Sequence, residues 1–238
     1  MEAAAENNIP LIVLDRPNPN GHYIDGPILD TAYRSFVGMH PIPIVHGMTI
    51  GEYAQMINGE KWLKDSVECD LTVIRMLGCN KQIPYDLPVK PSPNLPNAQA
   101  VNLYPSLCLF EGTNVSVGRG TDLPFQHFGA PFLESDYSFV PESGAGAKYP
   151  KHEGERCYGQ DLSQFTSLSQ LDLSFLIDAY NKCPKKDEFF NAFFDKLAGG
   201  NTLRLSIIEG KSEKEIRQSW SKELLEFDQM RKAYLIYQ

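Results

Sequence analysis

The chain alternates short apolar runs with stretches of helical spacing, which predicts an α/β protein. Residues 10–14 (PLIVL) form an apolar run that ends in turn residues, a pattern typical of a buried strand in a parallel sheet. Residues 71–76 (LTVIRM) predict a second strand, and residues 2–7 have the character of the end of a helix. Residues 80–97 are rich in proline and predict a loop.

Apolar residues at helical spacing predict five helices, over residues 49–58, 98–109, 171–180, 188–197 and 212–238. The first has a capping-box motif, with Thr49 before the helix and Glu52 three residues later. We expect Pro105 to interrupt the second helix and Gly199 to end the fourth. The aromatic stripe along the last helix predicts a packing face and not a ligand site.

The composition indicates a folded chain with a sizeable core, since 42% of the residues are hydrophobic and 22% are charged. A net charge of -8 without a Lys/Arg cluster argues against binding to nucleic acid or to an anionic membrane. No apolar run approaches the roughly 20 residues of a membrane span. The five cysteines form no CxxC motif, so the sequence predicts no metal site. We also expect no cofactor.

A stretch crowded with glycine and proline, residues 110–131 (FEGTNVSVGRGTDLPFQHFGAP), has the period of neither a helix nor a strand. Three other segments combine turn residues with side chains that can form hydrogen bonds: residues 15–21, 46–52 and 91–96. Loops of this kind on an α/β scaffold commonly carry binding sites. Their mixture of donors and acceptors suits a polyhydroxylated ligand such as a sugar. Nearby aromatic residues are candidates to pack on a sugar ring, namely Tyr23, Phe36, Phe110, Phe125 and Phe128.

Candidate side chains in residues 15–21, 46–52 and 91–96 also have structural interpretations. Glu52 is best explained as a capping partner, and His46 either faces a ligand or bonds to backbone. Arg16 follows a predicted strand, where ligands gather in open α/β sheets, but it could instead pair internally with Asp15. Asn94, between two prolines, is either a turn residue or a ligand contact.

Glu111 is the strongest candidate in the glycine-rich stretch. It stands at the entrance of the loop, with Arg119 eight residues further on, and a loop that folds back would bring them together. The same contact would serve as a salt bridge that braces the loop. The spacings of a Walker A loop, a GxSxG elbow and an HExxH motif are absent from the sequence, which disfavours those chemistries.

Several motifs together resemble the bacterial DUF1343 family, which is associated with exo-β-N-acetylmuramidases of the NamZ type. They are LDRPNP, SFVG, PIPIVHGMTIGE, PSPN, YPSLCLFEGTNVSVGRGTDLPFQHFGAP and IRQSW with FDQMRKAYLIY, in order from about residue 11 to the end of the chain. The resemblance implies the end of a Rossmann-like parallel sheet domain, residues 1–65, followed by a smaller α+β domain with a helical end, residues 66–238.

The resemblance also implies a function, the release of N-acetylmuramic acid from the non-reducing ends of peptidoglycan fragments. In this interpretation Glu111 is catalytic, and Arg16 or Arg119 pairs with the lactyl carboxylate of the sugar. The other expected substrate contacts are Asn18, His46, Asn94, Thr113 and Asn114. The alternatives are a non-catalytic module that binds muropeptides and a scaffold whose loops only brace an interface.

Family members normally carry, upstream of the part that matches here, a long α/β stretch with a PEHG-like motif. We therefore expect this chain to correspond to the C-terminal portion of a family member, with the upstream half as its partner. That half would supply a catalytic glutamate. The whole protein is expected in the periplasm or outside the cell.

Overall fold

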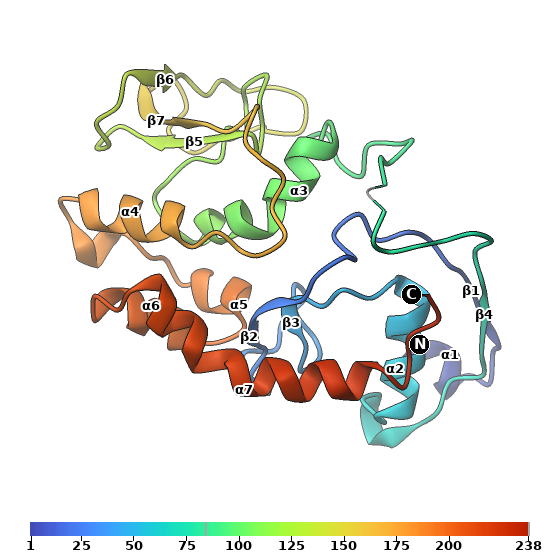
Figure 1. Ribbon diagram of the computed structural model, residues 1–238. Helices are drawn as coiled ribbons and strands as arrows, with labels where there is room; N and C mark the ends of the chain where they lie inside the picture. Colours follow the sequence, from blue (N-terminus) through green and yellow to red (C-terminus); the bar gives the residue numbers. More distant parts are fainter. Residues whose placement is uncertain (84, 238) are drawn as a thin grey trace.

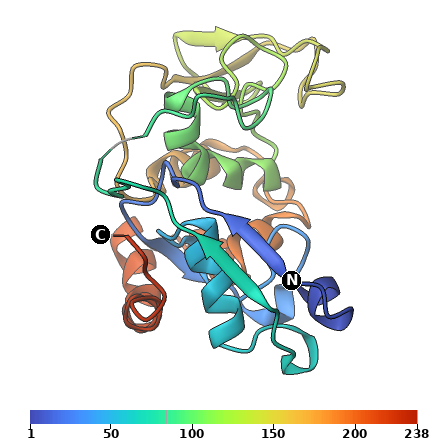
Figure 2. The ribbon, with the colours of Figure 1, turned by 90° about the vertical axis from the view of Figure 1, so that its right-hand side faces the viewer.

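The computed structural model describes residues 1–83 and 85–237 (Figure 1). Near the N-terminus the short helix α1 (Glu2–Glu6) leads into β1 (Leu11–Leu14), which pairs in parallel with β4 (Leu71–Ile74). Leu11 lies opposite Leu71. Figure 2 shows the two strands side by side. Both predicted strands are thus confirmed, and they form a two-stranded parallel sheet that is separate from the antiparallel sheets of the chain.

The connection between β1 and β4 holds a hairpin and a helix. The strands β2 (Asp25–Ile28) and β3 (Pro43–Val45) pair antiparallel, and α2 (Ile50–Gly59) follows. The capping box that the sequence predicts is present, because the Thr49 hydroxyl accepts from the Glu52 amide while the Glu52 carboxylate accepts from the Thr49 amide. The helix prediction for this segment is confirmed.

Helix α3 (Ala98–Leu107) runs through Pro105 without a break, so the expected interruption is wrong. Proline has no N–H for the carbonyl four residues earlier, which belongs to Val101. That carbonyl accepts instead from the Asn20 side-chain amide at 2.9 Å. A partner from a distant loop therefore replaces the missing helical bond.

The glycine-rich stretch contains a strand that its sequence pattern does not reveal. A three-stranded antiparallel sheet has the order β5 (His127–Ala130), β7 (Cys157–Asp161), β6 (Tyr137–Phe139). All four residues of β5 are buried, so the alternation of polar and apolar positions that marks a half-exposed strand is missing. Gly129 sits where a Cβ would lie 2.7 Å from the Tyr158 carbonyl oxygen of the neighbouring strand.

The C-terminal part is helical, with α4 (Ser174–Lys182), α5 (Phe194–Ala198), α6 (Thr202–Ile208) and α7 (Glu213–Arg231). The helix expected over residues 188–197 is wrong except in its last turn, although it does stop at Gly199, which has a φ of 76°. Helix α7 ends at Arg231, whereas the sequence predicted that it would continue to residue 238. Short 3-10 helices lie at Thr31–Tyr33, Lys64–Ser66, Cys108–Gly112 and Lys186–Glu188.

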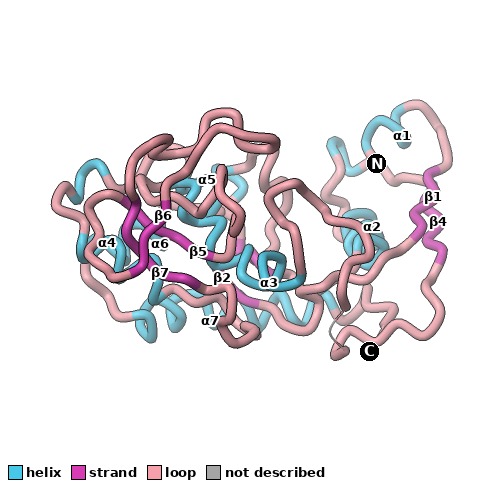
Figure 3. Tube along the Cα trace, turned by 90° about the horizontal axis from the view of Figure 1, so that it is seen from above, coloured by secondary structure: helices cyan, strands magenta, loops and turns pink. Residues whose placement is uncertain are grey.

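The main core joins α3, β5 and the helical C-terminal part, while smaller clusters lie around α2. Helix α7 packs along β2 and reaches toward α2, and it buries Ile216, Trp220 and Phe227 as the packing interpretation of its stripe expects (Figures 1 and 3). The fold is α/β with parallel and antiparallel sheets. Within the described residues, no helix is both long and apolar enough to cross a bilayer.

Candidate functional site

Asp15, the first residue after β1, fastens the loops at the carboxyl ends of the two parallel strands. Its Oδ1 accepts hydrogen bonds from the backbone amides of Arg16 and Gly51, each at 2.9 Å. Its Oδ2 accepts from the Thr49 hydroxyl at 2.7 Å. The Asp15 carboxylate is therefore occupied by backbone and by Thr49, and the Arg16 side chain extends into an exposed position.

Glu52 has a larger structural role than its capping box alone. It is fully buried, and it forms an ion pair at 3.1 Å with Lys81, whose side chain is only 6% exposed. Its Oε1 also accepts from the backbone amides of Ile236 and Tyr237, at 2.8 and 3.1 Å. The carboxylate thus ties α2, the loop after β4 and the C-terminal tail together.

A pocket of about 500 Å³ opens beside this cluster, at the carboxyl ends of the strands, and is lined by Arg16, Asn18, Lys81 and Tyr85 among others. Asn18 is occupied within the loop, because its amide donates to the Met48 carbonyl at 2.9 Å and its Oδ1 accepts from the Asn20 amide at 3.0 Å. Arg16 remains as a cation that a ligand can reach. The structure therefore brings Arg16 and Asn18 to one pocket, in different roles.

A second pocket, of about 490 Å³, is here called the histidine pocket and is lined in part by Phe36, His40, His46, Tyr53 and Tyr104. The His46 Nδ1 accepts from the Met48 amide at 3.2 Å, so the neutral ring carries its proton on Nε2. Burial, with Arg231 nearby, lowers the pKa of His46 to about 4. At neutral pH His46 is therefore an uncharged hydrogen-bond donor.

Tyr53 connects the two histidines of this pocket. Its hydroxyl lies 2.7 Å from the His40 Nδ1, and its ring stacks on His46 with the centroids 5.4 Å apart. Burial raises the pKa of Tyr53 to about 12, and burial followed by the charge of Arg34 lowers the pKa of His40. These groups are neutral donors and acceptors near pH 7. Sequence patterns did not identify Tyr53 or His40, and Tyr53 has the pattern of an apolar position of a helix.

Tyr104 connects the histidine pocket with the glycine-rich loop. Its ring lies 5.0 Å from that of Phe125, and the Arg119 guanidinium lies 4.9 Å from the Phe125 centroid on that ring's face. Burial first, with Cys108 and Glu111 as further causes, raises the pKa of Tyr104 to about 12, whereas Arg119 acts in the opposite direction. The charged pair of the loop therefore acts electrostatically on the wall of the pocket.

Glu111 and Arg119 are in contact, as a loop that folds back would place them. The Glu111 Oε1 accepts from the Arg119 Nε at 2.9 Å and Nη2 at 2.8 Å, and the two side chains are 25% and 34% exposed. They line a pocket of about 410 Å³, here called the loop pocket, together with Tyr149 and Lys151. A salt bridge that only stabilises the loop would show the same Glu111–Arg119 contact. The catalytic role of Glu111 and the binding role of Arg119 therefore stay predictions.

Lys151, which sequence patterns did not identify, stands behind this pair. Its ammonium donates to the carbonyls of Phe110, Thr113 and Val115, at 3.1 and 3.0 Å for the first and last. Burial lowers the pKa of Lys151 to about 8, against the opposing effect of Glu111. No sequence pattern predicts that a lysine in a loop will bind the carbonyls of a distant loop.

Thr113 and Asn114 hold the loop from within. The Thr113 hydroxyl donates to the Phe110 carbonyl at 2.9 Å and accepts from the Val115 amide at 3.1 Å. The Asn114 amide donates to the Cys183 sulfur at 3.8 Å. Neither side chain is among those that line the loop pocket.

Asn94 joins the proline-rich loop to the rim of the loop pocket. It is 6% exposed, and its amide donates to the Gly146 carbonyl at 2.8 Å. Gly146 itself lines that pocket. Of the aromatic residues proposed as sugar platforms, Phe110, Phe125 and Phe128 are core residues at 0 to 4% exposure, which corrects that expectation for them. Phe36 is fully exposed.

Two family models together match nearly the whole chain. The model described as "Exo-beta-N-acetylmuramidase NamZ, N-terminal" matches residues 1–99, and its C-terminal counterpart matches residues 102–237. The two meet within a few residues of the start of α3. The division after residue 65 that the sequence suggests stays a prediction.

Similar proteins agree with these models. Peptidoglycan beta-N-acetylmuramidase NamZ of Bacillus subtilis (strain 168) is 41% identical over 266 residues, which cover all of this chain and 62% of that protein. The chain thus spans less than two thirds of this relative. Crystal structures of two DUF1343 family proteins from Bacteroides fragilis NCTC 9343 superpose with TM-scores of 0.97 and 0.84, at 50% and 27% identity; each match covers the whole of this chain and 69% of the other. The chain belongs to the NamZ family, also described as DUF1343, as its motifs indicated.

Proposed function

We propose that the chain forms the sugar-binding part of an exo-acting glycoside hydrolase, which releases N-acetylmuramic acid from the non-reducing ends of peptidoglycan fragments. Family membership and the 41% identical peptidoglycan β-N-acetylmuramidase support this proposal. The observation that carries it is the histidine pocket. There a neutral His46 with its proton on Nε2 lines, together with Tyr53 and Tyr104, one cavity of a size that suits a small ligand.

The chemistry of these groups fits an amino sugar. Uncharged donors and acceptors bind hydroxyl and acetamido groups without requiring a counter-ion, and aromatic walls pack on the apolar face of a ring. The lactyl carboxylate of N-acetylmuramic acid adds one negative charge. Arg16, which is exposed, and Arg119 are the two cations proposed for it, because a charge-assisted bond to a guanidinium is both strong and directional.

Glycoside hydrolysis needs a proton donor and commonly a second carboxylate near an oxocarbenium-like transition state. Glu111 is proposed as the second carboxylate. Because it is paired with Arg119, it is better suited to accept hydrogen bonds or to face developing positive charge than to give a proton. The proton donor would come from the PEHG-like segment that the family resemblance implies. Asn18, Asn94, Thr113 and Asn114 would act on the sugar through the loops that they hold.

We further propose that β1 and β4 are the end of a Rossmann-like sheet, completed by the upstream half of the family fold. Their parallel pairing and the helix in the connection between them support this arrangement. In the described residues each of the two strands lies at a sheet edge, and Ile12, Leu14 and Ile74 on them are 50 to 69% exposed, which suits a sheet that further elements extend and cover. We also propose that the whole protein works in the periplasm or outside the cell, because the proposed substrate is a cell-wall polymer.

The test is release of free N-acetylmuramic acid from MurNAc-β-1,4-GlcNAc, by the chain alone and by the chain co-expressed with the upstream half. Glu111→Gln is compared with Glu134→Gln, which alters an exposed carboxylate outside both pockets. We expect release with the upstream half, its loss in Glu111→Gln and its retention in Glu134→Gln. Equal activity of the two variants would remove Glu111 from the chemistry.

The alternative is a module that binds muropeptides without cutting them. It is favoured by one observation, that three of the hydrogen-bonding residues of the histidine pocket are poor acids near pH 7, because the pKa of His46 is too low and those of Tyr53 and Tyr104 are too high. Binding of the disaccharide without release, even in the presence of the upstream half, would decide for this alternative.

A further inference from the structure

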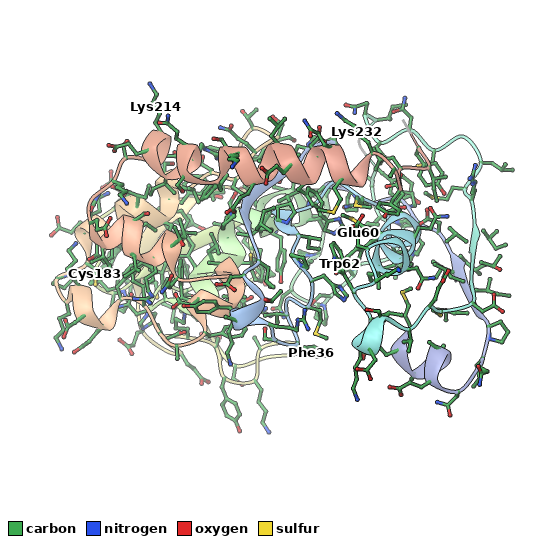
Figure 4. All side chains as sticks on the ribbon, turned by 90° about the horizontal axis from the view of Figure 1, so that it is seen from below. Phe36, Glu60, Trp62, Cys183, Lys214 and Lys232 are labelled. Atoms are coloured by element: carbon green, nitrogen blue, oxygen red, sulfur yellow. The ribbon has the colours of Figure 1, made fainter. Side chains whose placement is uncertain are left out.

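Phe36 is held in a position that leaves an entire aromatic side chain in solvent. Its exposed fraction is 101%, and its neighbours Val37 and Met39 are 51% and 46% exposed. Figure 4 shows Phe36 at the outer edge of the molecule, while Trp62 lies further inside. Exposed apolar clusters of this kind mark places where something binds.

The loop that carries Phe36 is well anchored at its base. Ser35 and Gly38 exchange two backbone hydrogen bonds, at 2.8 and 3.2 Å, so that Phe36 and Val37 form the tip of a tight turn. A Cβ on Gly38 would lie 2.5 Å from the Leu29 side chain, which shows how closely the base packs. A few residues earlier, Asp30 donates its backbone amide to the Gly199 carbonyl at 2.8 Å. The turn therefore presents the ring from a fixed base.

Phe36 also belongs to the wall of the histidine pocket, with His40, His46, Tyr53 and Tyr104. Most residues that line that pocket are apolar, His46 and Tyr53 add hydrogen-bonding groups, and Phe36 adds an aromatic ring. A ligand that matches both has a polar circumference and an apolar face. A pyranose ring has this combination, because its axial C–H groups form an apolar face and its hydroxyls and acetamido group lie at the edge.

We propose that Phe36 is the stacking platform on which the amino-sugar ring rests at the mouth of the histidine pocket. This inference rests on the proposed function and adds to it a residue that determines substrate affinity. The ring takes no part in bond cleavage. It covers one face of the sugar, while His46 and the tyrosines bind the polar edge. Because the turn is already fixed at its base, no mobile segment has to become ordered when the sugar binds to the Phe36 ring.

The experiment measures binding of MurNAc-β-1,4-GlcNAc by calorimetry to the full chain, for wild type, Phe36→Ala and Phe36→Trp. Leu225→Ala is the control, since that side chain is 59% exposed on α7 and lies outside the pocket. We expect Phe36→Ala to bind on the order of tenfold more weakly, Phe36→Trp to keep its affinity, and Leu225→Ala to match wild type. The unfolding temperature of all the variants should stay at the wild-type value, because the side chain touches solvent only.

Two results would overturn the proposal while the proposed function stands. One is a wild-type affinity in Phe36→Ala with co-purification of the upstream half retained, which would leave the ring without a role in binding. The other is a wild-type affinity together with loss of co-purification with the upstream half, which would make the turn a protein contact. A wild-type chain that binds no disaccharide would instead remove the proposed function, and this inference with it.

Discussion

Glu52 and Lys81 form a buried ion pair, with 3.1 Å between the Lys81 Nζ and each carboxylate oxygen. The backbone amides of Thr49, Ile236 and Tyr237 supply the remaining donors. Tyr237 also places its hydroxyl where it accepts from the Met76 amide at 2.9 Å, just beyond β4. The end of the chain thus closes over the carboxyl ends of the strands, and one carboxylate holds this arrangement together.

Replacement of Lys81 by methionine should lower the free energy of unfolding by about 3 kcal/mol, because it leaves the Glu52 charge buried without its cation. The matched control is Lys182→Met, which removes an ion pair with Asp178 whose side chains are more than half exposed. That change should cost less than about 1 kcal/mol. Urea unfolding of both variants checks the difference, and equal losses would show that the buried pair has no special weight.

Gly118→Ala should destabilise the chain more than Gly154→Ala, although both glycines have a φ of 74°. The backbone strain of a left-handed alanine costs about 1–2 kcal/mol at either position. At Gly154 a Cβ would enter open space, whereas at Gly118 it would lie 2.2 Å from the His127 ring. This overlap should add about 1–3 kcal/mol. Thermal unfolding of the pair isolates the overlap from the strain, and identical values would contradict it.

Local patterns in the sequence predicted those elements whose partners lie close along the chain. The Thr49–Glu52 capping box and the helix it begins were visible, because both partners lie within one helical turn. The strands over residues 11–14 and 71–74 were visible as apolar runs between turn residues. Their parallel pairing was not predicted, because the expected division after residue 65 put the two strands in different domains.

What sequence patterns missed depends on partners that are distant along the chain. Lys81 and Tyr237 reach Glu52 across 29 and 185 residues, and Lys151 reaches the loop carbonyls across 36 to 41 residues. No spacing rule connects such residues. The loop composition pointed to Glu111, Arg119 and His46 as candidates, but only the fold shows which atoms of these side chains are free and which are used.

Asn20→Ala should cost about 1–2 kcal/mol, because it removes the donor that serves the Val101 carbonyl where Pro105 offers none. In a Pro105→Ala background the alanine N–H can bond to that carbonyl, so the same Asn20→Ala change should cost distinctly less. A double-mutant cycle followed by urea unfolding measures this coupling. Additive effects would mean that the Asn20 amide does not replace the helical bond.

His127 should make the stability of the chain depend on pH between about 6.5 and 4. The Thr121 hydroxyl donates to the Gly118 carbonyl at 2.7 Å, so it accepts from the His127 Nε2–H, and Nδ1 then accepts from the Tyr137 hydroxyl at 2.6 Å. Burial lowers the pKa of His127 to about 4. Both ring nitrogens are thus committed to the neutral form.

Between pH 6.5 and 4 the unfolded chain binds a proton at His127 while the folded chain does not. The free energy of unfolding therefore falls as the pH is lowered through this window. The contribution of His127 levels off below about pH 4. The loss should reach about 2–3 kcal/mol for His127. Urea unfolding at pH 7, 5.5 and 4 should show a shallower pH dependence for His127→Gln than for wild type. His22→Gln, at a partly exposed ring, is measured beside it as the matched control. If His127→Gln keeps the wild-type slope, the buried ring takes up its proton as readily in the folded chain as in the unfolded one.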